Sequence, residues 1–214
     1  MNSIRRNFIF TLSLTALFVF VLPNAIVAAE KEITHALKRT IKQVVEIVYD
    51  DDLKRNPDTR RVLLQRAINQ QFNFNQMGAR ALAENWNARS AKERRAFILR
   101  FRNLLERSYV QRIESYEGGK IRFTDEVVKG KYAIVKTRIE MKRKSIDFDY
   151  KMIRENGQWK VYDILDQGVS IIRNYRHQLA STLKNESFSD LLKKMDKSKE
   201  GGHSVQVAWR TGSY

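Results

Sequence analysis

A tyrosine and two aspartates lie close together in one short apolar segment, GQWKVYDILDQGVSII at residues 157–172. Tyr162, Asp163 and Asp166 follow the apolar residues of an expected strand and precede an expected helix. A phenol beside a carboxylate at such a junction is suited to acid–base chemistry. The alternative is structural, with the aspartates holding the junction and Asp166 accepting hydrogen bonds from first-turn amides. The residue types favour the structural role.

The rest of the chain offers little support for catalysis or metal binding. His35, His177 and His203 are scattered, and no paired-histidine or carboxylate motif with ligand spacing accompanies them. The segment Gly168-Val169-Ser170 lacks the second glycine of a nucleophile elbow, and no glycine-rich phosphate loop is present. We therefore expect no catalytic residue, no metal site and no cofactor.

The first 29 residues have the pattern of a secretory signal peptide. Arg5 and Arg6 precede an apolar run from Phe8 to Leu22, and small residues at 27–29 precede Glu30. A permanent membrane anchor is the alternative, but the run is short for a span and ends at Pro23. We expect cleavage near Ala29 and a mature protein in the periplasm. With no cysteine, its stability must come from core burial.

The chain is strongly basic, with a formal net charge of +16. Such charge is typical of proteins that bind nucleic acid or anionic membrane surfaces, and export disfavours nucleic acid. Nucleic-acid binding would also need exposed aromatic side chains, whereas the aromatic residues here fall on inward faces. We expect docking to acidic partners or anionic lipid, aided by arginines on one expected helix: Arg94, Arg95, Arg102 and Arg107.

Helical periodicity dominates the first half of the mature chain. An amphipathic helix is predicted over residues 32–53 and ends at the acidic run 50–52; a second helix begins at Pro57. The segment SAKE at residues 90–93 is a capping box that starts a long helix ending at Gly118-Gly119. Gly168 is predicted to open a further helix, and the segment FSDLLKKM forms a short last one.

Between the long helix and Gly168 the apolar period changes to two, which predicts strands with one polar face. Apolar residues alternate with charged residues around Ile121, Ile139 and Phe148, and Asn156-Gly157 is a strong hairpin signal. The prediction is one α+β domain over residues 30–198, in which a four-stranded curved antiparallel sheet has helices over one face. Residues 199–214 form a polar tail without a predicted element.

The inward faces carry much aromatic and flexible apolar material. From composition alone, a packed core is the favoured interpretation, because aromatic residues at helical or strand spacing usually pack against each other. A ligand cavity lined by the same side chains is the alternative, and composition does not separate the two.

Two segments resemble the MlaC family of periplasmic phospholipid-binding proteins, also called the toluene-tolerance family: FNFNQMGARALAENWNARSAKERRAFILRFRNLLERSYVQRIESY and IDFDYKMIRENGQWKVYDILDQGVSIIRNYRHQLASTL. The resemblance covers residues 31–197. Its most specific parts are the capped helix, the strand WKVYD and the segment from Gln167 to Arg176, where Gln167 replaces a frequent glutamate.

The resemblance implies a fold similar to the NTF2-like one, enclosing an apolar cavity for two acyl chains. It implies a monomeric, non-enzymatic shuttle that moves phospholipid between inner and outer membranes and maintains outer-membrane lipid asymmetry. The implied partners are an inner-membrane ABC transporter complex with an MCE-domain subunit and an outer-membrane lipoprotein–porin complex. Two alternatives stay open: a carrier of hopanoid-type lipids, and an enzyme on a similar fold.

On this interpretation the apolar residues of the inward faces line the lipid cavity. The candidate lipid-binding residues are Phe74, Met77, Phe97, Phe101, Leu104, Tyr109, Val135, Ile139, Met141, Phe148, Tyr150, Met152, Val161, Val169, Ile172 and Tyr175.

Overall fold

A computed structural model describes the backbone of residues 24–114 and 119–197 and the side chains of residues 33–108 and 119–196. The apolar run of the predicted signal peptide and the predicted tail at 199–214 lie outside the described residues. Within the described part, no helix is both long enough and apolar enough to cross a bilayer.

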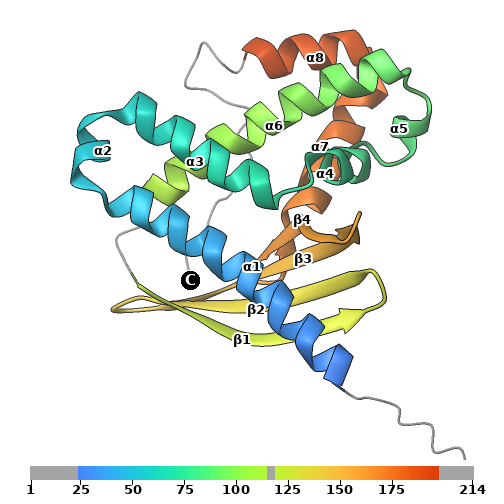
Figure 1. The fold of residues 1–214 in the computed structure, drawn as a ribbon. Helices are drawn as coiled ribbons and strands as arrows, with labels where there is room; N and C mark the ends of the chain where they lie inside the picture. The colour runs from blue at the N-terminus through green and yellow to red at the C-terminus, as the bar shows by residue number, and fades with distance from the viewer. Residues whose placement is uncertain (1–23, 115–118, 198–214) are drawn as a thin grey trace, which may run out of the picture.

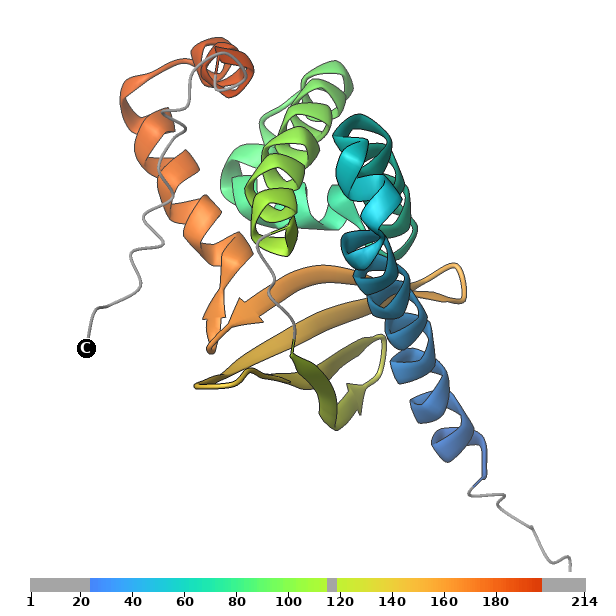
Figure 2. The same ribbon diagram turned by 90° about the vertical axis from the view of Figure 1, so that its left-hand side faces the viewer.

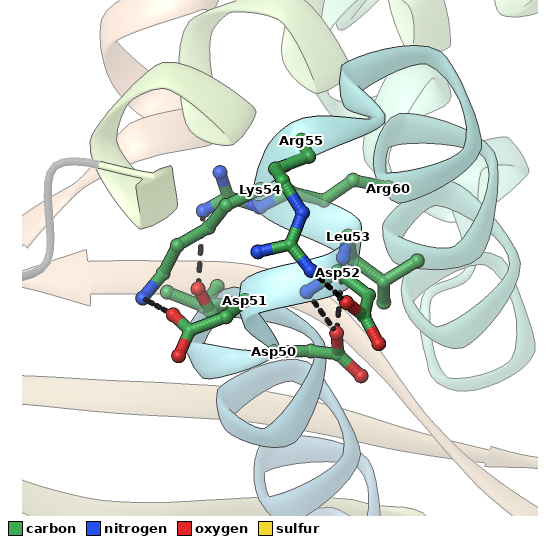
Figure 3. A network of polar contacts seen from close by, with 8 residues as sticks. Asp50, Asp51, Asp52, Leu53, Lys54, Arg55 and Arg60 are labelled. Atoms are coloured by element: carbon green, nitrogen blue, oxygen red, sulfur yellow. Dashed lines mark hydrogen bonds and ion pairs between the residues drawn. The ribbon is translucent and has the colours of Figure 1, made fainter.

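The first three helices form a helical hairpin, in which the third packs back along the first. Helix α1 (Asn24–Tyr49) ends where Asp50 caps α2 (Asp51–Arg55) by accepting hydrogen bonds from the amides of Asp52 and Leu53, both at 2.9 Å (Figure 3). The predicted end of the first helix at the acidic run is confirmed, but this run also starts a short helix. Helix α3 (Pro57–Gln71) begins at Pro57 as predicted and returns along α1, enclosing a small core of Ile47, Val48, Leu64 and Ala67.

Helix α1 also crosses the sheet, as Figure 1 shows. Its Thr34 amide donates to the Glu126 carboxylate of strand β1 (Lys120–Lys129) at 3.1 Å, and the Lys38 ammonium lies 4.9 Å from the Phe123 ring centre. Ile33 and Leu37 from the same part of α1 are buried in the main core. Helix α1 therefore connects this helical hairpin to the sheet.

The capping box predicted at Ser90 is confirmed. The Ser90 amide donates to Glu93 at 2.8 Å and the Glu93 amide donates back to Ser90 Oγ at 3.2 Å, at the start of α6 (Ala91–Glu114). Before it come α4 (Phe74–Leu82) and α5 (Glu84–Asn87). Gly78 lets α4 approach α6 closely, because a Cβ there would lie 2.3 Å from Ile98 Cδ1.

The sheet has five antiparallel strands in sequence order: β1 (Lys120–Lys129), β2 (Tyr132–Glu140), β3 (Ser145–Glu155), β4 (Gln158–Asp166) and β5 (Val169–Ser170). The predicted hairpin at Asn156-Gly157 is confirmed, since both residues have positive φ, 50° and 77°. The predicted strand number of four was wrong by one.

The fifth strand lies where the sequence predicted the start of a helix. Gln167 and Gly168 turn the chain with positive φ, 49° and 81°, so Val169 and Ser170 pair with β4 before α7 (Ile171–Asn185) begins. The N-cap of α7 is Ser170, whose Oγ accepts from the Arg173 amide at 3.0 Å, rather than Asp166. Helix α8 (Phe188–Lys197) follows.

The helices lie over one face of the curved, unclosed sheet. Helix α8 lies in this layer at the edge farthest from the sheet (Figures 1 and 2). The main core fills the space between the two layers and takes side chains from α1, α4, α6, α7 and α8 and from the inner faces of β2, β3 and β4. The predicted α+β class is confirmed.

Candidate functional site

The tyrosine and aspartates of β4 form a structural junction. Asp163 is 5% exposed, and its carboxylate accepts from Ser170 Oγ at 2.7 Å and from the Ile164 and Ile172 amides at 2.9 and 3.1 Å. The Lys151 ammonium lies 3.7 Å away. These contacts occupy both oxygens and tie β4 to the start of α7, which is the structural role predicted for this residue.

Tyr162 is turned toward other neighbours. The Arg80 guanidinium lies 4.3 Å from its ring centre, and the Tyr132 ring meets it edge-on at 6.0 Å. Burial raises the pKa of Tyr162, so the phenol stays protonated at neutral pH.

Two halves of the sheet's inner face differ in how they are covered. Near the β1–β2 and β3–β4 turns, one row of opposite residues runs from Ala133 through Met152 to Val161, and all three are buried. Val135, next along β2 on the same face, is also buried. We call this part the packed half.

Toward the β2–β3 turn the inner face is only partly covered, and we call this part the open half. Ile139 lies opposite both Ile121 and Ile146, and all three side chains are half-buried. Phe148, also half-buried, lies in a row with Asp166 and Val169, so these side chains share one face.

The helices complete the packed half with aromatic rings. Phe97 stacks on Phe101 at 5.3 Å, and Phe101 meets the Tyr175 ring edge-on at 5.3 Å; all three are buried. The Tyr175 hydroxyl lies 3.4 Å from Ser108 Oγ, which gives the phenol a polar neighbour. These buried rings belong to the predicted lipid-binding set and pack against one another.

The structure divides the candidate lipid-binding residues into groups. The buried ones are Met77, Phe97, Phe101, Leu104, Val135, Met152, Val161, Ile172 and Tyr175. Phe74, Phe148 and Tyr150 are half-buried against the core, Ile139 and Met141 are half-buried near the open end, and Val169 is 43% exposed. The side chain of Tyr109 lies outside the described residues.

Ile121 and Ile146 belong to the open half but were absent from the predicted set. The strand alternation could have identified them, because each isoleucine has the same strand phase as residues in the predicted set. Their pairing with Ile139, however, depends on the register of the sheet.

Phe148 and Tyr150 lie in ring contact at 5.7 Å. Burial raises the pKa of Tyr150, so its neutral phenol suits an apolar surface.

A separate surface pocket of about 310 Å³ lies between the α3–α4 junction, α6 and β4. Phe72 and Phe74 stack in it at 6.2 Å, and Leu99 in its wall is 51% exposed. Of the candidate residues, only Phe74 lines it. Among the described residues, no group of three or more histidine, aspartate or glutamate side chains could hold a metal ion.

Comparison with known proteins identifies the family. The sequence model of the MlaC protein family matches residues 38–197 of this chain. The chain belongs to the MlaC family. The intermembrane phospholipid transport system binding protein MlaC of Haemophilus influenzae is 24% identical over 152 residues, which cover 68% of this chain and 71% of that protein.

A solved structure shows the same fold. The phospholipid-binding protein from Ralstonia solanacearum, determined in complex with a phospholipid, superposes with a TM-score of 0.70 at 19% sequence identity. The superposition covers 77% of this chain and 95% of the Ralstonia chain. The MlaC-family resemblance predicted from the two sequence segments is therefore confirmed.

Proposed function

We propose that this MlaC-family protein is a phospholipid carrier that shields acyl chains against the open half of its sheet. One observation carries the proposal: apolar side chains in register on β1, β2 and β3 remain only half-buried, although Ala133, Val135, Met152 and Val161 on the same face are buried. Contiguous uncovered apolar surface of this kind is typical of a binding site. The shared fold of a phospholipid-complexed protein supports the same ligand class.

The free energy of transfer makes such a carrier necessary. An acyl chain of about 14 methylenes costs roughly 11 kcal/mol to expose to water, at about 0.8 kcal/mol per methylene. An apolar surface removes this cost without covalent chemistry. Met141 and Phe148 are suited to chains of varied length, because a methionine side chain adapts its shape. The three hydrogen bonds that Asp163 accepts at its junction support a structural role for this residue.

The pathway part of the proposal rests on the sequence and on the relative's role. Residues 1–29 act as a cleaved signal peptide, and residues 30–198 form the lipid-binding domain in the periplasm. The chain then moves phospholipid between the two membranes, as the name of the Haemophilus relative states for that protein. Its partners are an inner-membrane ABC transporter complex with an MCE-domain subunit and an outer-membrane lipoprotein–porin complex.

The test is mass analysis of what the protein carries when it is purified from a periplasm without detergent. We expect a two-chain phospholipid near one molecule per protein. The matched control is the same protein after organic extraction and refolding, which should regain lipid from vesicles. An extract empty of lipid contradicts the proposal, and a fused-ring lipid in the extract replaces phospholipid with a hopanoid-type ligand.

A further inference from the structure

The turn between β2 and β3 carries three consecutive cations. Met141 N–H donates to the Lys144 carbonyl at 2.9 Å and closes the turn, which leaves Lys142, Arg143 and Lys144 exposed. These three side chains have no hydrogen bond or ion pair with any residue that the structure describes. We call residues 141–144 the basic turn.

Three other cations of the neighbouring strands are paired with carboxylates. Arg122 pairs with Glu140 at 2.6 Å and Arg138 pairs with Asp147 at 2.7 Å, so both carboxylates beside the basic turn already have a cation. Lys136 likewise pairs with Asp125 at 2.8 Å. The unpaired positive charge of this end of the sheet therefore lies mainly on the three cations of the turn, with the exposed Lys120 beside them on β1, opposite Glu140.

Two of the four α6 arginines that the sequence favoured for docking are held by neighbouring groups. Arg94 donates to the Trp86 carbonyl at 3.0 Å and stacks 5.0 Å from the Trp86 ring centre. Arg102 lies 3.7 Å from the buried Glu106 carboxylate. Side chains held in this way are poorly placed to meet an external anion, whereas those of the basic turn are free to do so.

We propose that the basic turn docks on the anionic surface of a lipid bilayer and brings the open half of the sheet to the membrane. The turn directly continues the strands that carry Ile139 and Ile146, so docking there places these apolar side chains beside the lipid. The purpose of docking rests on the proposed carrier function, but the charge argument does not.

A bilayer fits this surface better than an acidic protein does. Specific protein interfaces need buried apolar or aromatic anchors at their centre. No large exposed apolar side chain of the described residues lies in the basic turn, and Met141 is half-buried. A densely anionic surface attracts adjacent cations without shape complementarity, and each cation near it strengthens binding by a factor of about five.

The test is flotation of the purified protein with vesicles of phosphatidylcholine alone or mixed with phosphatidylglycerol. The wild type should bind the mixed vesicles and not the neutral ones, and added salt should weaken binding because it screens the charges. The triple variant Lys142→Gln, Arg143→Gln, Lys144→Gln should bind the mixed vesicles about a hundredfold more weakly. Its unfolding midpoint and bound-lipid content should equal those of the wild type.

The control variant makes the same change in net charge at exposed residues of α3 and α6: Arg61→Gln, Arg66→Gln and Arg95→Gln. It should keep most of the vesicle binding. The proposal is overturned if both triple variants lose vesicle binding equally. It is also overturned if the wild type does not bind anionic vesicles, and that result assigns the turn to a protein partner. If the protein binds anionic vesicles but carries no lipid, the docking proposal holds and the proposed carrier function is refuted.

Discussion

The packed and open halves of the sheet share one alternating sequence pattern but differ in what covers them. In the packed half, Val135 and Met152 are fully buried in the same core cluster as Phe97, Phe101 and Tyr175 of α6 and α7. In the open half, Ile139 and Phe148 have the same phase on the same strands and remain half-buried. The comparison teaches that apolar alternation identifies the inner face of a sheet, whereas the helix layer decides which part of that face can hold a ligand.

The largest expected effect is in the packed half, for Phe101→Ala. Phe101 is fully buried between Phe97 and Tyr175, so its truncation should lower the free energy of unfolding by about 3–5 kcal/mol. The measurement is urea unfolding of delipidated protein. Phe148→Ala in the open half is the matched control and should cost clearly less. Equal costs for the two variants would remove the distinction between the halves.

A second prediction separates the junction from the binding surface. Asp163→Asn replaces an acceptor-only carboxylate by an amide, whose NH₂ cannot accept from Ser170 Oγ or the nearby amides. We expect a loss of about 1–3 kcal/mol in unfolding free energy, with unchanged lipid content in the folded fraction. Asp166→Asn is the control and should cost less. A fully stable Asp163→Asn variant without transport activity would instead favour a chemical role.

The smallest effect concerns Glu106 on α6, whose carboxylate accepts a hydrogen bond from Gln65 Nε2 of α3 at 2.9 Å. Burial raises the pKa of this carboxyl in the folded protein above its unfolded value near 4.5. The protonated form is therefore favoured by folding, and this contribution is lost as pH rises through the folded pKa. Glu106→Gln removes the ionisable group, so it should raise the free energy of unfolding at neutral pH by about 1 kcal/mol or less.

Unfolding free energies of wild type and Glu106→Gln, measured from pH 4.5 to neutral, check this sign. The difference between the two proteins should grow in favour of the variant as pH rises. A difference that stays constant over this range would show that the Glu106 carboxyl has the same pKa in both states.

Local signals in the sequence predicted much of the fold. The capping box of Ser90 and Glu93, Pro57 at a helix start, and the Asn156-Gly157 turn each act within a few residues, so the sequence alone indicates the elements that they start or join. The fifth strand was missed because Val169 and Ser170 pair with β4 after a turn at Gln167-Gly168, and that turn does not resemble a common two-residue hairpin signal.

The candidate site was predicted less completely. Apolar phase correctly placed Val135 and Ile139 on one inner face, but the sequence could not show that one is buried and the other half-exposed. That difference depends on how the helix layer lies over the sheet, which is a long-range property. Ile146 was missed for the same reason, since its pairing with Ile139 follows from register.

The most direct test of the account fills each half of the same strand with an indole. In Ile139→Trp the added ring should occupy the space that lipid uses, so the delipidated variant should unfold close to the wild type while carrying clearly less lipid. In Val135→Trp, four residues away on the same face, overpacking should cost about 1–3 kcal/mol or more. Thermal unfolding and bound-lipid content are measured for both. A large stability loss in Ile139→Trp, with unchanged lipid content in the folded protein, would contradict lipid binding at the open half.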